Sequence, residues 1–151
     1  MRIIIKILTL LILAIFVGSI TAQRGKGSST PTDLTGTSWQ LVKFQNSDGE
    51  TVTPDDKSKY TITFGANGHA TVRVDCNRGG GPWKYKGTNQ IEFGSMNISH
   101  AKCGPGSLHD SIVREGAAVR DYSIRNGHLF FSLKDGGAAY ELEPLARGKK
   151  K

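Results

Sequence analysis

Apolar and polar residues alternate along several short segments of the chain, and this pattern predicts β-strands. The alternation is cleanest at residues 60–64, where Tyr60, Ile62 and Phe64 share one face because successive strand side chains point to opposite sides. Segments of the same kind, rich in aromatic and β-branched residues, occupy residues 37–44, 69–76, 82–86, 90–93, 121–125, 128–133 and 139–143. The domain is therefore expected to be mostly β-structure.

Tight turns separate many of these segments. Residues 67–68 and 126–127 are both Asn-Gly, a pair that supplies the positive φ angles of a two-residue hairpin turn. Residues 135–137 (Asp-Gly-Gly) mark a third hairpin, whereas the polar residues 45–59 are expected to form a long surface loop. Short connections favour antiparallel neighbours, so we predict about eight strands in a small open barrel or a strongly curved antiparallel sheet.

The period of the pattern changes once, and this change predicts a single helix over residues 107–119. Ser107 is suited to the N-cap, and Asp110 stands three residues later, where a capping box has its acid. The apolar stripe of this helix consists of Leu108, Ile112, Gly116 and Val119. The fold class is accordingly mainly β with one inserted helix (α+β).

Six aromatic side chains are expected in the core rather than on a binding surface. Phe130 and Phe131 are adjacent in a strand, so they point to opposite faces and one of them is expected outside the barrel. An apolar opening there could bind a lipid or a partner peptide. The six residues are Trp39, Trp83, Tyr85, Phe93, Phe130 and Phe131.

The beginning of the chain is typical of a secretory signal peptide. Residues 1–6 carry Arg2 and Lys6, residues 7–20 are almost continuously apolar, and Ala22 offers a small residue for cleavage. An uncleaved membrane anchor is the alternative, but the apolar run is short for a span of about 20 residues. We expect residues 1–22 to be removed and the chain to be exported, to the periplasm or beyond.

The net charge of +7 arises from the ends of the chain. Eight of the 20 basic residues lie in the signal peptide, in a flexible linker at 23–33 and in a basic tail at 146–151. The predicted domain, residues 34–145, then carries charges of both signs in nearly equal number, without the basic face of a nucleic-acid-binding domain. The tail could contact a membrane weakly, although a solvated terminus is the simpler interpretation.

Two cysteines, Cys76 and Cys103, are expected to form a disulfide, because an exported protein folds in an oxidising compartment. Alternation along residues 69–76 places Cys76 on the core face. Two free thiols remain the alternative if the protein meets a reducing environment. A redox-active disulfide is disfavoured because the Cys-x-x-Cys spacing is absent.

Four segments occur in an order that resembles the META domain family, also called HslJ-like. They are residues 36–41 with Trp39, the run Asp75-Cys76-Asn77-Arg78, residues 101–103, and the closing strand 129–133. The resemblance covers residues 34–145, with Asp75 standing where a glycine is usual and without the usual Thr-Arg-Met before the second cysteine. It implies a β-rich fold with one helix, exported in many members, some of which are linked to heat shock, motility or secretion. The family supplies no agreed catalytic residues, so we assign none.

Alternative sites are less well supported by the spacing. His100 and His109 with Cys76 and Cys103 could be drawn as a zinc site, but His-x-x-Cys is only a fragment of the usual ligand spacing. The glycines at 79–81 are followed by a strand rather than a helix, so a bulge or wide turn is expected instead of a phosphate loop.

Ser107, His109 and Asp110 contain the residue types of a nucleophilic triad. Neighbours within one helical turn are expected to point in different directions, and the chain has no Gly-x-Ser-x-Gly elbow. The sequence therefore favours a protein that is not an enzyme.

The function expected from these observations is binding in the cell envelope or outside the cell, by a monomer without a cofactor. The partner would be another envelope protein or a small apolar ligand, and not a nucleic acid. A structural or stress-protective protein without a specific ligand is the alternative. A cavity lined by core aromatics would favour a ligand, whereas a filled core with an exposed edge strand would favour a protein partner.

Overall fold

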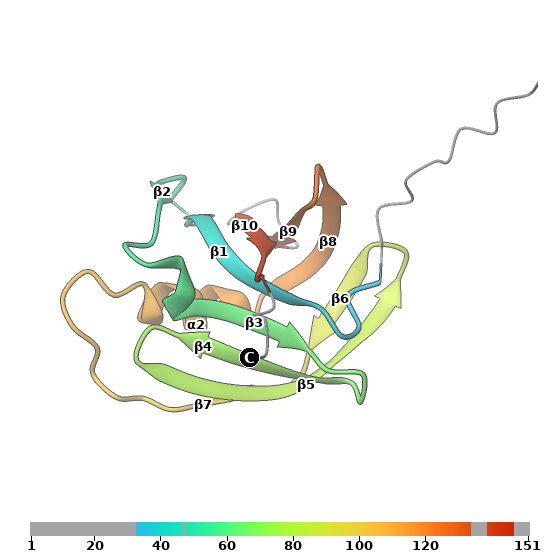
Figure 1. Cartoon of the computed structure of the whole chain (residues 1–151), viewed down its shortest axis with the longest axis horizontal. Coiled ribbons are helices and arrows are strands. Elements are labelled where there is room, and N and C mark those ends of the chain that lie inside the picture. The colour runs from blue at the N-terminus through green and yellow to red at the C-terminus, as the bar shows by residue number, and fades with distance from the viewer. Residues whose placement is uncertain (1–32, 47, 134–138, 147–151) are drawn as a thin grey trace, which may run out of the picture.

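A computed structural model describes residues 33–46, 48–133 and 139–146 (Figure 1). The predicted signal peptide, nearly all of the linker, the turn at 135–137 and the end of the basic tail lie outside these residues. The strands are β1 Ser38–Gln45, β2 Thr51–Val52, β3 Tyr60–Phe64, β4 His69–Val74, β5 Asn77–Gly87, β6 Gln90–Phe93, β7 Asn97–Ile98, β8 Val119–Arg125, β9 His128–Leu133 and β10 Ala139–Pro144. The helices are a 3-10 turn, Lys57–Lys59, and α2, His109–Gly116.

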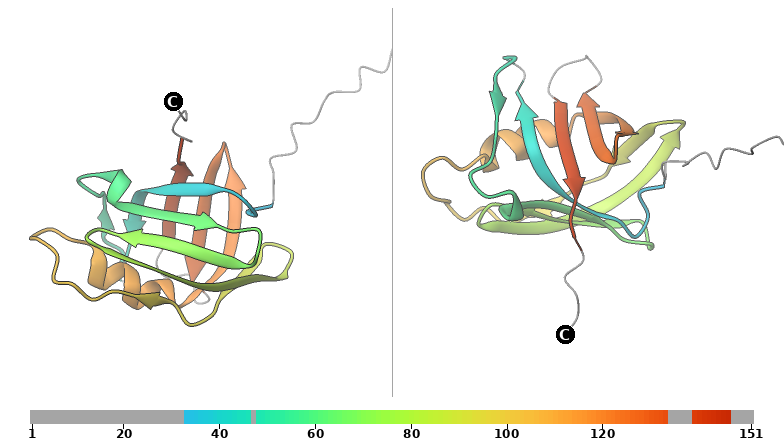
Figure 2. Two further views of the ribbon diagram at one scale, coloured as in Figure 1. Left: turned by 60° about the horizontal axis from the view of Figure 1, so that its bottom comes forward. Right: turned by 45° about the horizontal axis from the view of Figure 1, so that its top comes forward.

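Eight of the strands form a closed antiparallel barrel in the order β1, β3, β4, β5, β6, β8, β9, β10. The predicted β-rich fold with one helix is thus confirmed, and the barrel is closed where an open one was expected. Strand β1 closes it, because it pairs with β3 over Ser38–Gln40 and with β10 along most of its length. The weakest seam is between β6 and β8, which pair in register only at Gln90 and Asp121. Figure 2 shows the two sides of the barrel curving around its interior.

The interior is filled from one side by a group of aromatic rings. Phe64 is fully buried, and its ring lies 4.8 Å from that of Trp83 and 6.3 Å from that of Phe131. Tyr60 and Ile62 are buried with it, as the alternation of β3 predicts. One expected core residue lies outside: Tyr85 is 40% exposed.

The predicted outward position in β9 belongs to Phe130. Phe131 is buried in the barrel, whereas Phe130 is partly exposed and lies beneath the guanidinium of Arg125, 4.2 Å from the ring centroid. The charge of Arg125 thus covers the apolar ring on the outer face.

The two Asn-Gly turns differ. Asn126 and Gly127 both have positive φ, of 53° and 79°, as a two-residue hairpin turn requires. At the other turn only Gly68 is left-handed, with φ 72°, and its N–H donates to Gly65 O at 3.3 Å. The prediction of the same turn type was wrong there, because the loop is longer and needs one left-handed residue. The expected long loop at 45–59 also contains β2 and the 3-10 turn.

Helix α2 is shorter than predicted at both ends. Ser107 Oγ accepts a hydrogen bond from His109 N at 3.2 Å, but the helix begins only at His109. Asp110 does not complete a capping box, since its carboxylate contacts His109 Nδ1. At the other end Val119 is the first residue of β8 and not part of the helix. Among the described residues, α2 and the 3-10 turn are both too short to cross a bilayer, and no membrane-spanning helix is present.

The glycines at 79–81 lie inside β5 and not in a bulge or wide turn. They pair with Val72, Thr71 and Ala70 of β4, and Gly79 also pairs with Ile98 of β7. A Cβ on Gly79 would collide with the backbone of Asn97. The run of glycines therefore lets the segment before β7 pass closely over β5.

Candidate functional site

A cavity of about 380 Å³ lies between α2 and the inner face of the barrel. This volume falls within the range of sites that bind small molecules. Figures 1 and 2 show α2 at the end of the barrel where β3 begins and β4 ends. The aromatic residues that line the cavity are Tyr60, Phe93, Phe131 and Tyr140. The aliphatic lining residues include Leu41, Ile62, Val72, Val74, Ile98, Ile112, Val113 and Leu142.

Two features of the sequence produce this hollow. The inward positions of β4 near α2 carry Val72 and Val74, which are too small to reach across the barrel. Opposite them, α2 presents Ile112 and Val113, and then Gly116, which has no side chain. The aromatic group around Phe64 fills the other part of the interior, so the space remains beneath the helix.

A third wall is the segment between β6 and β7. Gly94, Ser95 and Met96 line the cavity there, held close to β5 by the glycines of that strand. At Gly81 an added Cβ would stand 2.7 Å from Met96 Sδ. The glycine run, which we expected to form a bulge, therefore helps to close the cavity.

Two tyrosine hydroxyls accompany the apolar wall. Tyr60 Oη accepts a hydrogen bond from Leu108 N at 3.1 Å and so ties β3 to the start of α2. Tyr140 Oη donates to Ile112 O across 3.5 Å, the limit of a hydrogen bond. Burial, and after it the negative charge of Glu115, raises the pKa of Tyr140. The Tyr140 hydroxyl therefore stays protonated and remains a donor.

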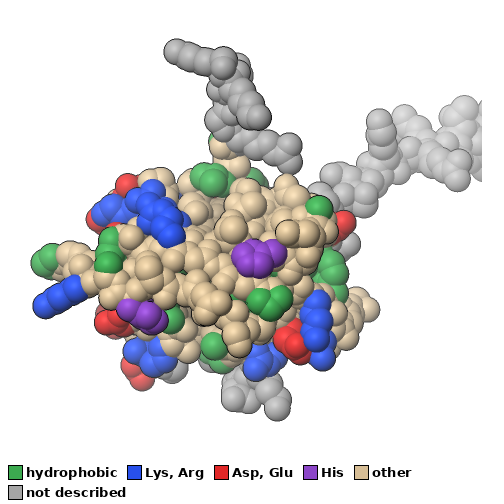
Figure 3. Space-filling model, turned by 90° about the horizontal axis from the view of Figure 1, so that it is seen from below, with side chains coloured by type: hydrophobic (Ala, Val, Ile, Leu, Met, Phe, Trp, Pro, Cys, Tyr) green, Lys and Arg blue, Asp and Glu red, His purple; other side chains and the backbone are tan. Residues whose placement is uncertain are grey.

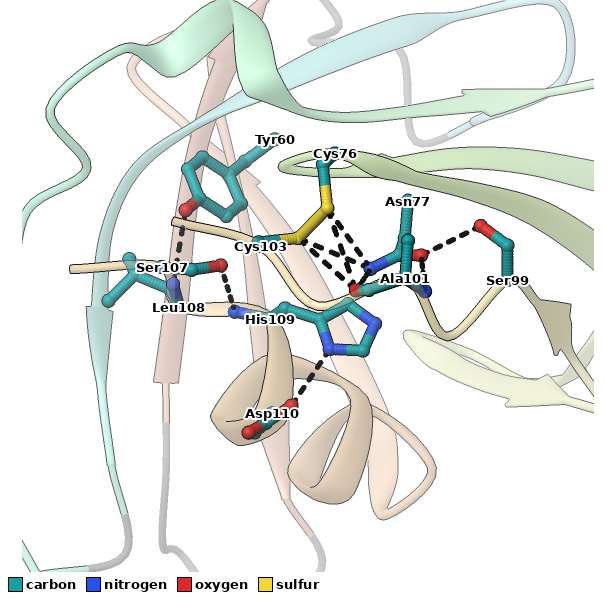
Figure 4. A network of polar contacts seen from close by, with 10 residues as sticks. All are labelled: Tyr60, Cys76, Asn77, Ser99, Ala101, Cys103, Ser107, Leu108, His109 and Asp110. Atoms are coloured by element: carbon teal, nitrogen blue, oxygen red, sulfur yellow. Dashed lines mark hydrogen bonds and ion pairs between the residues drawn. A yellow bond between two sulfur atoms is a disulfide. The ribbon is translucent and has the colours of Figure 1, made fainter. Parts of the chain in front are cut away.

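The segment leading into α2 is held by the predicted disulfide. Cys76 and Cys103 are bonded, with their Cα atoms 5.6 Å apart (Figure 4). The bond joins the turn between β4 and β5 to the chain that precedes the helix. The disulfide thus takes up both cysteines of the possible zinc site. Of the four candidate ligands only His100 and His109 are left, with ring centroids 6.1 Å apart.

The motif residue Asn77 lies beside this bond and is fully buried. Its Oδ1 accepts from Ser99 Oγ at 2.8 Å and from Ala101 N at 2.7 Å, and its Nδ2 donates to Ala101 O at 2.9 Å. Cys76, which alternation places on the core face, is exposed in the turn. The prediction was wrong because β4 ends at Val74 and the inward position passes to Asn77, the partner of Val74 in β5.

The other motif residues also organise the backbone. Asp75 adopts a left-handed conformation with φ 58° in the turn. Its carbonyl accepts from Arg73 Nε at 3.2 Å and from the Arg78 guanidinium at 3.3 Å. Trp39 is buried in the core, and its indole N–H donates to Thr37 Oγ1 at 2.7 Å. Their positions therefore give them architectural roles.

Ser107, His109 and Asp110 do not form a catalytic triad. His109 Nδ1 lies 2.9 Å from Asp110 Oδ1, a contact that we did not expect between neighbours in one turn. Ser107 Oγ, however, bonds the backbone N–H of His109 rather than its ring. Within the described residues, His109 Nε2 is buried without a hydrogen-bond partner.

Charged side chains of both signs are interspersed on the surface. Lys84 and Lys86 contact the carboxylate of Glu92 at 3.1 and 3.0 Å. On the face shown in Figure 3, acidic and basic side chains lie mostly toward the edges. The charge distribution thus matches the near-neutral domain that the sequence indicates.

The sequence did not reveal the cavity or the pair Tyr140 and Glu115. Alternation along residues 139–143 marks Tyr140 and Leu142 as one face, which is a usable signal for their inward orientation. The empty volume depends on how residues from eight strands and the helix pack around it. No local sequence pattern predicts this packing.

Comparison with known proteins places this geometry in context. The family model described as META domain matches residues 32–143. No curated protein matches the chain at a significant level. A protein from Burkholderia xenovorans solved by NMR is 21% identical with a TM-score of 0.60, and the match covers 76% of this chain and 85% of that one. A DUF4847 family protein from Bacteroides vulgatus, in a crystal structure, is 15% identical with a TM-score of 0.52, over 77% and 95% of the two chains. These identities are low, and the likenesses concern the fold.

Proposed function

Because this chain belongs to the META domain family, we propose that it is an exported domain that binds a small apolar molecule in the cavity beneath α2. The observation that carries the proposal is the cavity of about 380 Å³, whose wall is mostly hydrocarbon. Binding a complementary apolar body there would remove both surfaces from water, at about 25 cal/mol per Å² buried. The protein would hold its ligand without transforming it.

The arrangement of the barrel favours a small molecule over a protein partner. A partner that adds a strand needs a free sheet edge. Here β1 and β10, which would be the two edges of an open sheet, pair with each other instead. The aromatic lining by Tyr60, Phe93 and Phe131 is the feature expected of a ligand site.

Export is supported by the signal-peptide pattern and by the disulfide. Bonds such as Cys76–Cys103 persist in oxidising compartments and are rare in the cytosol. We therefore place the protein in the periplasm or outside the cell. Recovery of the mature chain beginning near Gln23, from the envelope or the medium, would test this location.

The binding test uses N-phenyl-1-naphthylamine, a neutral apolar fluorophore, titrated with the purified protein. Val113→Phe places a phenyl ring in the cavity wall, and we expect it to weaken binding by about tenfold or more, because the added ring occupies space that the ligand would otherwise fill. Val52→Phe is the matched control, since Val52 lies on β2 and outside the cavity lining. Circular dichroism checks that both variants are folded.

Saturable binding at one site, lost in Val113→Phe and kept in Val52→Phe, would support the proposal. Wild-type protein that gives no saturable signal would overturn it. Equal affinities in Val113→Phe and wild type would also overturn it, since the fluorophore would then bind elsewhere.

A further inference from the structure

The polar end of the cavity indicates what kind of molecule it takes. We infer that the ligand is a neutral apolar molecule with a carbonyl-type oxygen that accepts a hydrogen bond from Tyr140 Oη. This inference rests on the proposed function and adds the chemical class of the ligand. It depends on the placement of Tyr140, Gly116 and Glu115 around the same end of α2.

Tyr140 is 6% exposed, and its ring packs 4.8 Å from that of Phe44, so its position is fixed by the core. The hydroxyl at the other end of the ring has one long hydrogen bond, the 3.5 Å contact with Ile112 O. That oxygen belongs to the α2 backbone. A buried hydroxyl with so weak an acceptor gains from a better one.

Space for an acceptor exists beside this hydroxyl. A Cβ built on Gly116 would stand 3.9 Å from Tyr140 Oη, and apart from the adjoining residues and backbone of α2 no other heavy atom of the described residues would lie within 4 Å. Gly116 and Tyr140 both line the cavity. A ligand oxygen could therefore approach Oη from the open side of the glycine.

Tyr60, the other hydroxyl of the wall, is less suited to this role. Its Oη already accepts from Leu108 N at 3.1 Å, which fixes its orientation toward the start of the helix. Tyr140 Oη has no N–H donor bonded to it in the described contacts, and it keeps its proton because its pKa is raised. The donor function is thus assigned to Tyr140.

Glu115 accounts for the neutrality of the ligand. It is 7% exposed, its Oε1 contacts the Arg114 guanidinium at 3.2 Å, and its buried Oε2 has no partner among the described residues. Its negative charge helps to raise the pKa of the Tyr140 hydroxyl, and this effect exceeds the opposing effect of the Arg114 charge. A ligand carboxylate at the same place would be repelled, whereas a ketone or ester oxygen would not.

Three related compounds test the class: butyrophenone, butylbenzene and 4-phenylbutanoate, each displacing N-phenyl-1-naphthylamine from the full exported protein. Butyrophenone and butylbenzene differ by a carbonyl in place of a methylene. We expect Tyr140→Phe to weaken the binding of butyrophenone by roughly 3- to 10-fold, which is the effect of one hydrogen bond. The affinity for butylbenzene should stay within about twofold of the wild-type value, because butylbenzene has no oxygen to accept that bond. Tyr122→Phe is the control, because Tyr122 lines a separate cleft with Asp33 and Tyr85.

Glu115→Gln tests the charge. The wild type is expected to bind 4-phenylbutanoate more weakly than butyrophenone. The variant should bind 4-phenylbutanoate about fivefold more tightly than the wild type does, while its affinity for butyrophenone should be unchanged. Gly116→Ala offers a variant that should fold well, since alanine favours the helix, and its methyl group should weaken butyrophenone by narrowing the space beside Oη.

The outcomes separate the two proposals. If none of the three compounds binds, the proposed function fails. If butylbenzene and butyrophenone bind and Tyr140→Phe affects both equally or neither, apolar binding stands and the role of Tyr140 is wrong. If only Tyr60→Phe weakens the binding of butyrophenone, the hydrogen bond to the ligand comes from Tyr60 and not from Tyr140. If the wild type binds 4-phenylbutanoate more tightly than butyrophenone, the inference that the ligand is neutral is overturned.

Discussion

The side-chain amide of Asn77 bonds both backbone groups of Ala101, as a neighbouring strand would. Oδ1 accepts from the Ala101 N–H at 2.7 Å, and Nδ2 donates to the Ala101 carbonyl at 2.9 Å. Asn77 is fully buried, so these bonds replace water for a segment that has no strand partner at this point. The amide thereby fixes the chain that leads into α2 and so the wall of the cavity.

Asn77→Ala should lower the free energy of unfolding by about 2–4 kcal/mol. The change removes the three hydrogen bonds to the N–H and carbonyl of Ala101 and the hydroxyl of Ser99, at about 0.5–1.5 kcal/mol for each bond. Urea denaturation measures the effect, with Asn97→Ala, an exposed position on β7, as control. A loss below about 0.5 kcal/mol, the scale of ordinary surface changes, would contradict this role.

Reduction of the disulfide should lower stability while the fold persists. Cys76 and Cys103 are 27 residues apart, and closing such a loop contributes about 3–4 kcal/mol in the chain-entropy model. The hydrogen bonds of Asn77 would still hold the two segments together. Urea denaturation with and without a phosphine reductant measures the difference, and the Cys76→Ser/Cys103→Ser double variant should not respond to the reductant. Equal stability of the oxidised and reduced protein would show that the bond carries no stabilisation.

The parts of the fold that were predictable are those with a local cause. Strand β3 alternates cleanly and has the predicted bounds, because one face meets the core and the other meets solvent. The Asn126-Gly127 turn also follows from its own residues. The partner of Cys76 was predictable because the chain has only two cysteines.

The parts that were missed depend on contacts between distant segments. The strand predicted over residues 69–76 is two residues too long at Cys76, because Asp75 reverses the chain and the next inward position is that of Asn77. The glycines of β5 looked like a bulge, since the β7 segment that needs their missing side chains is almost 20 residues away. The cavity was unpredictable for the same reason, because Val72 of β4 and Gly116 of α2, which both line it, are more than 40 residues apart in the sequence.

Asp75→Gly should stabilise the protein by about 0.5 kcal/mol. Asp75 has a φ of 58°, which costs an L-residue roughly 1–2 kcal/mol, and glycine avoids this cost while losing about 0.5–1 kcal/mol through the freer unfolded chain. This conformation also accounts for the glycine usual at the position in the family. Asp75→Ala keeps the Cβ and should not stabilise, which makes it the control for loss of the carboxylate. A stabilising Asp75→Ala would show that the charge, not the backbone, limits stability here.

The stabilisation that the Glu141 carboxylate gives to the fold should be lost in acid. The hydrogen bond from Lys43 lowers the pKa of the Glu141 carboxyl below its ordinary value of 4.5, burial opposes the shift, and the contact with His128 Nδ1 at 2.8 Å adds to it. Because the pKa is lower in the folded state, the carboxylate stabilises the fold above its unfolded pKa, and this contribution disappears as the pH falls through the folded pKa. Glu141→Gln should therefore be less stable than the wild type near neutrality, and the difference should shrink below the ordinary value.

Urea denaturation of both proteins at a series of pH values from neutral to acid measures this difference. Glu50→Gln is the matched control, because Glu50 is exposed in the loop before β2, and its curve should follow that of the wild type. The other carboxylates with lowered pKa, such as Glu92 and Glu143, act equally in all three proteins, so only the difference between curves reports on Glu141. A difference that stays constant with pH would mean that Glu141 contributes through packing on β10 rather than through its charge.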